Sequence, residues 1–348
     1  MIWVLLQLVL SRFINSPNHK HKMDKKEQKN NKSGKTISRH ILPGIDVLNN
    51  VMPKDNSSQT ISMRTCVESK EFQESKYHLP VILGEDINRK TQIIDLVKVP
   101  CILISGMSNK EINNMLNVLI SSLVIKKNPE QLKLILIDAS KIELLPYNKL
   151  IHKFFGSIPK TQKAIISGYK DAIKTLENLN NKIDYRAELL EKANVRSIDE
   201  YNKKLISNQL DKNNKHKHLP YLVVIINEYS FYKSKLPKEL EIEISRAALN
   251  AKKLGVHLII TTQNPGIEII TGMIKFSFPG RIAFQVKDKI DSRTVIDIAS
   301  AEKLTGNGDM LFLNGESENE ELLSLQTPHI SKPELLEMLN FIEKQADD

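Results

Sequence analysis

The feature that most constrains the fold is a short apolar run that ends in a glycine and continues into a helix, between Cys101 and Asn113. The run Cys101–Ser105 has the length and composition of a buried strand, and Gly106 fits a tight turn. Apolar residues then recur at helical spacing, at positions 112, 115, 116, 119 and 123. We therefore predict a strand, a turn and a helix that begins near Asn109, an arrangement that presents a helix N-terminus to a ligand.

Phosphate-binding loops at such a junction follow the pattern G-x-x-x-x-G-K-[ST], in which backbone N–H groups and the lysine hold the phosphates. Gly106 supplies the first glycine, but Glu111, Ile112 and Asn113 occupy the second glycine, the lysine and the Ser/Thr positions. Loss of the lysine removes a charge-assisted contact of about 1.5–3 kcal/mol, and Lys110 lies two residues too early to replace it. Glu111 places a carboxylate where phosphate would approach, and we expect it to fill the positive end of the helix itself.

From Val81 onward the chain alternates between short apolar runs and longer helical segments. The runs rich in Ile, Val and Leu are predicted strands, at Ile102–Ser105, Lys133–Asp138, Tyr221–Ile226, His257–Thr262 and Arg281–Val286. Helical periodicity covers Asp171–Lys192, Leu236–Lys253 and Lys332–Lys344, and an acidic loop is expected at Gly315–Glu321. This alternation predicts an α/β fold with a mainly parallel sheet that is flanked by helices.

A second candidate site lies where Asn227 and Glu228 follow six apolar residues of the predicted strand that starts at Tyr221. In nucleotide-hydrolysing proteins an Asp at the first position helps to hold Mg²⁺, and a Glu at the second can orient the attacking water. Asn227 lacks the first carboxylate, whereas Glu228 keeps the second. A buried strand that merely ends in a polar cap explains the same residues equally well.

Other polar residues follow neighbouring predicted strands and belong to the same candidate crevice, because ligands of open α/β sheets bind at the carboxyl ends of strands. Asp138 ends one strand. Thr261, Thr262 and Gln263 end another, where they could reach a γ-phosphate or a water molecule. Arg281 and Arg293 are the candidates for an arginine supplied across a subunit boundary. An ordinary surface or strand-end role is an equally good interpretation of each.

The charge balance permits a polyanionic partner without requiring one, since 50 basic residues stand against 41 acidic residues, a net charge of +9. Cys66 and Cys101 offer no disulfide framework and favour a reducing cytosol.

The apolar start Met1–Ile14 is too short to span a bilayer, and fits a truncated membrane segment or sequence translated upstream of a start at Met23. Residues 18–40 form a basic tail, which is either a solvated linker or an arm that touches DNA or lipid headgroups.

From about residue 61 to 313 the chain resembles the motor domain of the FtsK/SpoIIIE DNA translocases. Its sequence looks most like those of family members from Bacteroidota. The resemblance rests on a series of ordered strings, which include His78–Gly84, Leu136–Asp138, Val195–Ile198, Gly255–Leu258, Thr262–Pro265, Ile270–Lys275, Lys289–Thr294 and Gly308–Leu311. It implies a RecA-like P-loop NTPase fold in a hexameric ring. That ring moves double-stranded DNA with ATP and Mg²⁺ during chromosome segregation and cell division.

The resemblance also assigns roles to the residues of the candidate site. It makes Glu228, Gln263, Arg281 and Arg293 the catalytic candidates. The cofactor-binding positions are Gly106, Lys110, Glu111, Ile112, Asn113 and Asn227, which keep little of the family's chemistry. Three interpretations stay open. The first is an active ATP-driven translocase of duplex DNA, for which we expect impaired ATP hydrolysis. The others are a non-hydrolysing DNA-binding or ring-scaffold protein of a reduced-genome bacterium, and a decaying gene product.

The resemblance finally implies a division of the chain. Residues 1–40 are the apolar start and basic tail, 41–80 a remnant of the family's α domain and its junction, and 81–314 the motor domain. Residues 315–348 are the acidic loop and last helix, and the family's winged-helix γ domain is expected to be missing. We expect a cytoplasmic protein, with association to membrane proteins of the division site as an alternative.

Overall fold

The computed structural model describes residues 61–155, 165–210, 216–236, 238–316 and 321–344. These ranges belong to one compact unit that spans residues 40–348. The predictions for residues 1–60, and for most of the acidic loop at 315–321, lie outside the described residues. Within the described ranges, no helix combines the length and the hydropathy that crossing a bilayer requires.

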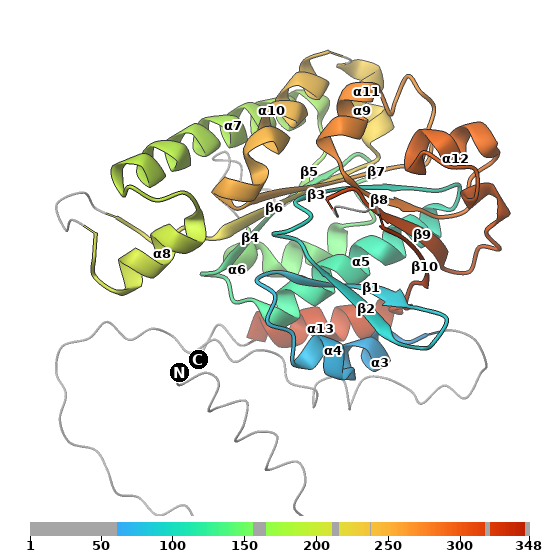
Figure 1. Cartoon of the computed structure of the whole chain (residues 1–348), viewed down its shortest axis with the longest axis horizontal. Helices are drawn as coiled ribbons and strands as arrows, with labels where there is room; N and C mark the ends of the chain where they lie inside the picture. Colours follow the sequence, from blue (N-terminus) through green and yellow to red (C-terminus); the bar gives the residue numbers. More distant parts are fainter. Residues whose placement is uncertain (1–60, 156–164, 211–215, 237, 317–320, 345–348) are drawn as a thin grey trace, which may run out of the picture. The chain divides into compact units, whose positions relative to one another are not determined.

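The described residues form a ten-stranded sheet with the order β2-β1-β10-β9-β8-β3-β7-β6-β4-β5 (Figure 1). Strands β8, β3, β7, β6, β4 and β5 pair in parallel, whereas β8, β9, β10, β1 and β2 pair antiparallel. The bounds of the strands are β1 Pro80–Glu85, β2 Thr91–Asp95, β3 Cys101–Ser105, β4 Leu132–Asp138, β5 Ile165–Ile166, β6 Tyr221–Asn227, β7 Val256–Thr262, β8 Gly280–Ala283, β9 Asp309–Asn314 and β10 Glu321–Gln326.

Helices cover both faces of this sheet, with α5 and α13 on one face and α7 and α10 on the other (Figure 1). Strands β3, β6 and β7 are therefore buried along their whole length, which explains their unbroken apolar sequence. The helical elements are α3 Met63–Glu68, α4 Lys70–Gln73, α5 Asn109–Lys126, η1 Leu145–Leu150, α6 Ile151–Phe154, α7 Tyr169–Lys192, α8 Ile198–Ile206, α9 Tyr229–Lys235, α10 Glu239–Leu254, α11 Gly272–Ser277, α12 Lys289–Ile296, η3 Ala301–Lys303 and α13 Lys332–Lys344. The predicted α/β class, with a mainly parallel sheet between helices, is confirmed.

Each of the five predicted strands is present. The predicted end of one strand and the predicted start of one helix were wrong. Strand β8 ends at Ala283 rather than Val286, because the chain beyond it follows the turn after β3: the Phe284 N–H donates to the Ser105 carbonyl at 2.8 Å. The helix predicted to start at Leu236 starts at Glu239, and Leu236 instead ends α9 in a non-helical conformation. A proline follows Leu236 in the sequence, and the residue before a proline disfavours helical backbone angles.

The antiparallel half of the sheet was not predicted. Strands β1 and β2 form a hairpin, and β10 follows the acidic segment and pairs with β9 along its length. The sheet thus runs on past residue 314, where we placed the end of the motor domain, and α13 buries Leu335, Met338, Leu339 and Ile342. The domain limits stay a prediction, although no break in the sheet lies at residue 314.

Candidate functional site

The first candidate site begins with Gly106 at the carboxyl end of β3, which lies between β8 and β7. A side chain does not fit here, because a Cβ at this position would lie 2.6 Å from the Cβ of Phe284. The Met107 N–H donates to the Gln285 carbonyl at 2.8 Å. Glycine is therefore needed for the close approach of the segment after β8, and that segment closes one side of the turn.

Helix α5 begins at Asn109, as the sequence predicted, and Ser108 caps it. The Ser108 hydroxyl accepts a hydrogen bond from the Glu111 N–H at 3.3 Å, and its carbonyl accepts one from the Ile112 N–H at 3.2 Å. Ile112 is fully buried, whereas Lys110 is exposed. The position that would carry the phosphate-binding lysine therefore packs into the core.

The Glu111 carboxylate holds a distant loop in place. Its Oε1 accepts a hydrogen bond from the Gly308 N–H at 2.8 Å, across 197 positions of sequence. Gly306, Asn307 and Gly308 all have left-handed backbone, with φ of 77°, 55° and 93°. We expected this carboxylate to fill the end of its own helix; it lies in the first turn of α5, but its recorded partner belongs to the loop before β9.

Two amide oxygens remain buried without a hydrogen-bond partner at the start of α5, those of Asn109 and Asn113. The residues are four positions apart and therefore lie on the same face of the helix. Both atoms are acceptors, so they could receive a hydroxyl or ammonium donor, but they offer nothing to a phosphate oxygen. Among the described residues, no three His, Cys, Asp or Glu side chains converge as they would to hold a metal ion.

The second candidate site is a hydrogen-bonded row across the ends of β4, β6 and β7. Asn227 is fully buried, its Nδ2 donates to Asp138 Oδ1 at 3.0 Å, and its Oδ1 accepts from Thr261 Oγ1 at 2.6 Å. Asp138 also accepts hydrogen bonds from the N–H groups of Ser140 and Leu144, at 3.1 and 3.3 Å. The structure thus brings these strand-end residues together, and both ends of the Asn227 amide are already used.

Glu228 follows Asn227 in a left-handed conformation, with φ of 58°. Its N–H donates to Thr261 Oγ1 at 3.1 Å, and Gln263 Nε2 donates to its Oε1 at 2.7 Å. A left-handed backbone is uncommon for residues other than glycine and often occurs at functional sites. Glu228 and Gln263, which the sequence proposed as catalytic candidates, therefore lie in direct contact.

Glu143 belongs to the same edge of the sheet and was missed in the sequence. Burial raises the pKa of its carboxyl group, and the charges of Asp138 and Glu228 raise it further, while Lys332 opposes them. The sequence does contain a signal for the turn in which Glu143 lies, because an Asp two residues before a Ser is typical of a turn that the Asp side chain stabilises. The Asp138 carboxylate does accept from both the N–H and the hydroxyl of Ser140.

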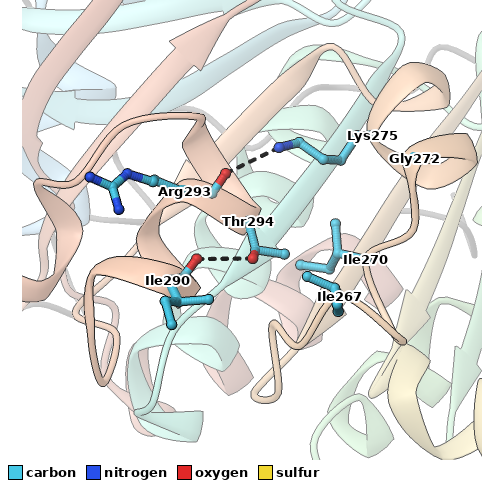
Figure 2. A pocket seen from close by; sticks show the side chains of 7 residues that line it. All are labelled: Ile267, Ile270, Gly272, Lys275, Ile290, Arg293 and Thr294. Carbon is cyan, nitrogen blue, oxygen red and sulfur yellow. Dashed lines mark hydrogen bonds between the residues drawn. The ribbon is translucent and has the colours of Figure 1, made fainter.

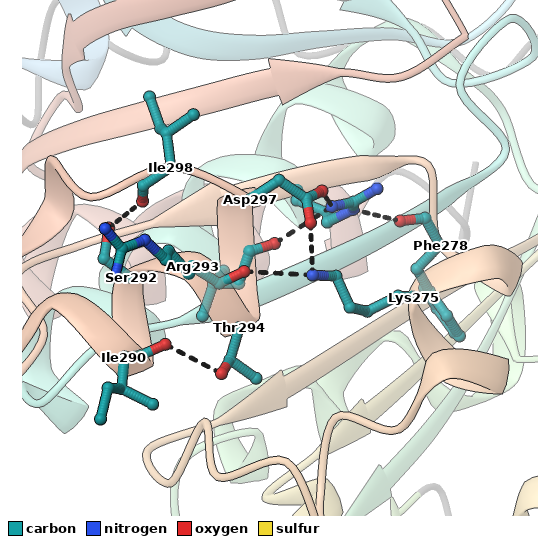
Figure 3. A network of polar contacts seen from close by, with 10 residues as sticks. Lys275, Phe278, Ile290, Ser292, Arg293, Thr294, Asp297 and Ile298 are labelled. Atoms are coloured by element: carbon teal, nitrogen blue, oxygen red, sulfur yellow. Dashed lines mark hydrogen bonds and ion pairs between the residues drawn. The ribbon is translucent and has the colours of Figure 1, made fainter.

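The two candidate arginines have different surroundings, and Figure 3 shows those of Arg293. Arg281 is largely buried; its Nε donates to the Phe278 carbonyl at 3.2 Å, and its guanidinium forms an ion pair with Asp297. Arg293, on α12, is exposed, and in the described part of the chain its guanidinium has no recorded partner. The Arg281 guanidinium is therefore bound within its own chain, whereas the Arg293 guanidinium is exposed to solvent.

The profile of the FtsK/SpoIIIE family matches residues 62–267. The DNA translocase FtsK of Chlorobaculum tepidum is 35% identical over 305 residues, which is 87% of this chain and 36% of that protein. The DNA translocase SftA of Bacillus subtilis is 36% identical over 304 residues, 87% of this chain and 30% of that protein. The chain thus spans about a third of the length of the curated relatives that it matches.

Solved structures show the same fold at low sequence identity. The pCW3 conjugation coupling protein TcpA, solved with ATPγS, superposes with a TM-score of 0.64 and 22% identity, over 79% of this chain and 72% of that chain. The cytoplasmic domain of the type VII secretion ATPase EccC from Thermomonospora curvata gives a TM-score of 0.65 and 16% identity, over 82% of this chain and 34% of that chain. These likenesses support the RecA-like P-loop NTPase architecture expected from the sequence.

Proposed function

Because the chain belongs to the FtsK/SpoIIIE family, we propose that it acts on double-stranded DNA as an FtsK-type translocase subunit in chromosome segregation and cell division, with ATP hydrolysis impaired at its own site. The side chains around Gly106 favour complete impairment, in which the site neither binds nor hydrolyses ATP. The relatives named DNA translocase support the substrate, and the side chains around Gly106 support the impairment.

The burial of Ile112 is the observation that carries the impairment. A phosphate-binding lysine must reach out of the first turn of the helix, but this side chain is fully enclosed by the core. The neighbouring Glu111 adds a negative charge where the phosphates would lie, and its carboxylate is held by Gly308. The residues around Gly106 therefore do not fit a nucleoside triphosphate.

A magnesium ion fits no better. Magnesium prefers charged oxygen ligands in near-octahedral geometry. Asn227 supplies an amide whose oxygen already accepts from Thr261, and the Asp138 carboxylate already accepts from several donors. Binding an ion here would break this row of hydrogen bonds, which is a cost that the residues present do not offset.

Hydrolysis of radiolabelled ATP, with Mg²⁺ and duplex DNA present, tests the impairment. We expect the turnover of the chain and of a Glu228→Gln variant to be equal and at background, because Glu228 has no bound nucleotide to act on. Turnover by the chain that Glu228→Gln abolishes would contradict the proposal. So would tight, Mg²⁺-dependent binding of ATP in a calorimetric titration.

One observation favours a second candidate, an ATP-driven translocase that still works. Glu228, Gln263 and Thr261 keep their polar side chains and their mutual contacts at the sheet edge, and these groups are the ones that would position a water molecule. The Glu228→Gln experiment separates the two candidates, because it affects turnover in the second alone.

Binding to duplex DNA is tested separately. The net charge of +9 suits a polyanionic partner, and neutralised phosphates release counterions, so affinity should fall steeply as salt rises. Fluorescence anisotropy of a labelled duplex over a salt series measures this slope. Absence of binding at low salt would leave the decaying gene product as the remaining interpretation.

The family also suggests the setting in which the protein works. We propose a homo-oligomeric ring, with hexamer as the expected state, in the cytoplasm near membrane proteins of the division site. Arg293 is then the arginine offered to the neighbouring subunit, because Arg281 is bound within its own subunit by Asp297. Electron microscopy of the chain with duplex DNA would reveal or exclude a ring.

A further inference from the structure

Side chains that can bind a metal ion also gather at the opposite edge of the sheet, at the amino ends of the central strands. Tyr221 is the first residue of β6, about 20 Å along that strand from Asn227. His78 lies two residues before β1, and Asp199 lies in the first turn of α8. Three segments that are distant in the sequence therefore meet here, away from the candidate site at the carboxyl edge.

The polar atoms of these three side chains converge. Tyr221 Oη lies 3.3 Å from His78 Nδ1, and Asp199 Oδ1 lies 3.5 Å from the same nitrogen. The Tyr221 hydroxyl donates to Asp199 Oδ1 and closes the triangle. Ligand atoms bound to one zinc ion at about 2.0–2.1 Å and at tetrahedral angles lie about 3.3 Å apart. The spacing around His78 Nδ1 is therefore that of two ligands on one ion.

The donor set suits a transition-metal ion. Imidazole nitrogen and carboxylate oxygen are common zinc ligands, and tyrosine oxygen binds iron in some haem proteins. Tyr221 takes the place of a third His, Cys, Asp or Glu, of which the described residues bring no three together. The His78 side chain is 51% exposed, so a water molecule can reach the fourth tetrahedral position.

The charges around these atoms favour a cation. Burial raises the pKa of the Tyr221 hydroxyl, and the nearby carboxylates of Asp199 and Asp95 raise it further. Lys127 lies near the same two carboxylates and offsets one of them. The ring of His257 lies 5.7 Å from that of Tyr221, and burial lowers its pKa to about 3, so this imidazole is neutral and does not repel an ion.

Asp95 also holds the backbone that carries the first ligand. Its carboxylate accepts hydrogen bonds from the N–H groups of His78 and Leu79, at 3.1 and 3.0 Å. The Tyr221 N–H donates to the Gln131 carbonyl at 2.9 Å. Partners of this kind orient metal ligands before the ion arrives, so binding needs little rearrangement of the backbone.

The surface pocket of about 360 Å³ between the segment after β7, α11 and α12 has the opposite character (Figure 2). Ile267, Ile270 and Ile290 line it together with the cationic Lys275 and Arg293. None of the described residues that line this pocket is acidic. A metal ion is therefore favoured at the amino edge of the sheet and not in the pocket.

We propose that His78, Asp199 and Tyr221 bind a divalent transition-metal ion, with Zn²⁺ as the expected ion. The phenol proton of Tyr221 passes to solvent when its oxygen binds the ion. The ion joins the segment before β1 to α8 and β6, and so stabilises the fold at this edge. This role goes beyond the proposed function and does not depend on it.

Titration of the full chain with Zn²⁺ in a calorimeter tests the site. His78→Gln, Asp199→Asn and Tyr221→Phe should each weaken binding at least about tenfold. The chain has nine histidines, so binding alone does not locate the ion. The matched control is His216→Gln, because His216 bonds Tyr201 instead and its loss should leave the affinity unchanged. Absence of zinc binding, or binding that the three variants leave unchanged, would overturn the proposal.

A readout specific to tyrosine separates metal binding from a purely structural role. Zinc should produce the ultraviolet difference absorbance of an ionised phenol in the chain and not in Tyr221→Phe. Because each ion displaces one phenol proton, the affinity of the chain should rise about tenfold from pH 7 to pH 8. The rise should be much smaller for Tyr221→Phe, which keeps the buried ring and should keep the circular dichroism of the chain. Zinc binding without ionisation of a phenol would contradict the assignment of Tyr221.

Thermal unfolding tests the stabilising role. Saturating Zn²⁺ should raise the melting temperature of the chain, and a chelator should reverse the rise, because the ion binds the folded state. His78→Gln should fold without the ion and should show no such rise. A rise that persists in His78→Gln would place the ion elsewhere and overturn the proposal. Neither result affects the proposed function, since its tests rest on ATP turnover and DNA binding.

Discussion

At the scale of single residues, Gly106 has a packing role that does not depend on any ligand. Gly106→Ala would place a Cβ 2.6 Å from the Cβ of Phe284, and overpacking of this kind costs about 1–3 kcal/mol. We expect urea denaturation to show this loss of stability. The matched control is Gly272→Ala, where a Cβ meets nothing within 4 Å and where stability should be unchanged or slightly higher. Equal effects of the two substitutions would show that Phe284 moves freely.

His257 gives a second prediction at this scale, on pH dependence. It is fully buried in β7, and burial lowers its pKa to about 3, whereas the unfolded chain should titrate near about 6.5. Below pH 6.5 the unfolded state binds a proton that the folded state does not, so stability falls as the pH falls towards 3. The slope is half its limit at pH 6.5 and approaches about 1.4 kcal/mol per pH unit below about pH 5.5, so the loss between pH 6.5 and 4.5 is about 2 kcal/mol.

The measurement for His257 is the free energy of unfolding at several pH values, for the chain and for His257→Leu. The difference between the two curves isolates this residue from the carboxylates, which titrate in both proteins. The Leu variant should lose stability less steeply below pH 6.5. Parallel curves would mean that the imidazole reaches solvent in the folded state.

At this scale, residues whose environment depends on neighbours in the sequence are predictable, and residues with distant partners are not. Ile112 belongs to the helical apolar pattern of α5, so its burial, and with it the loss of the lysine position, could be read from spacing. The partner of Glu111 could not, because Gly308 lies 197 positions away and only the folded sheet brings them together. The same holds for Asp138 and Asn227, whose contact depends on the register of β4 and β6.

At the scale of elements, helix α5 is tied to both ends of the described fold. Asn114, one position after the degenerate motif, donates to the Pro328 carbonyl at 2.8 Å and accepts from the Ile330 N–H at 3.1 Å. His329, between them, donates its N–H to Ile61 and accepts from the Met63 N–H. The helix that starts at the candidate site therefore anchors the segments that enter and leave the fold.

This anchoring predicts a local effect of Asn114→Leu. The substitution leaves a carbonyl and an N–H without partners, which costs about 1–3 kcal/mol. Hydrogen exchange at Met63, His329 and Ile330 should become roughly tenfold faster or more, while exchange in the central strands stays slow. Asn117→Leu is the matched control, because Asn117 bonds Tyr147 instead and does not contact these segments. Faster exchange throughout the central strands would contradict a local role.

The central parallel strands were predictable, and the antiparallel ones were not, for a physical reason. Strands β3, β6 and β7 are covered on both faces, which demands unbroken apolar runs that stand out in a sequence. Strand β2 is half exposed and reads Thr-Gln-Ile-Ile-Asp, which is also compatible with a loop. Strand β10 starts at Glu321, where the sequence predicts the end of an acidic loop, and it pairs with β9 in antiparallel register from that residue on.

At the scale of the whole molecule, the described segments beyond residue 314 add strand β10 to the sheet and helix α13 to its face. Strand β10 lies between β9 and β1, so its removal would leave two unpaired strand edges. Loss of the whole segment would also remove the buried side chains of Leu325 in β10 and of Leu335, Met338, Leu339 and Ile342 in α13. Each buried side chain of this kind contributes about 1.5–3 kcal/mol, and their sum is of the order of a domain's whole stability, about 5–15 kcal/mol.

A chain that ends after Asn314, the predicted limit of the motor domain, should therefore fail to unfold cooperatively and should be digested rapidly by protease. The control ends after Lys344, which keeps β10 and α13, and it should melt like the full chain, because α13 ends there. Circular dichroism during heating and limited proteolysis make the comparison. A cooperative transition of the shorter chain near that of the control would show that β9 and β1 tolerate open edges, and that the motor fold is complete at residue 314.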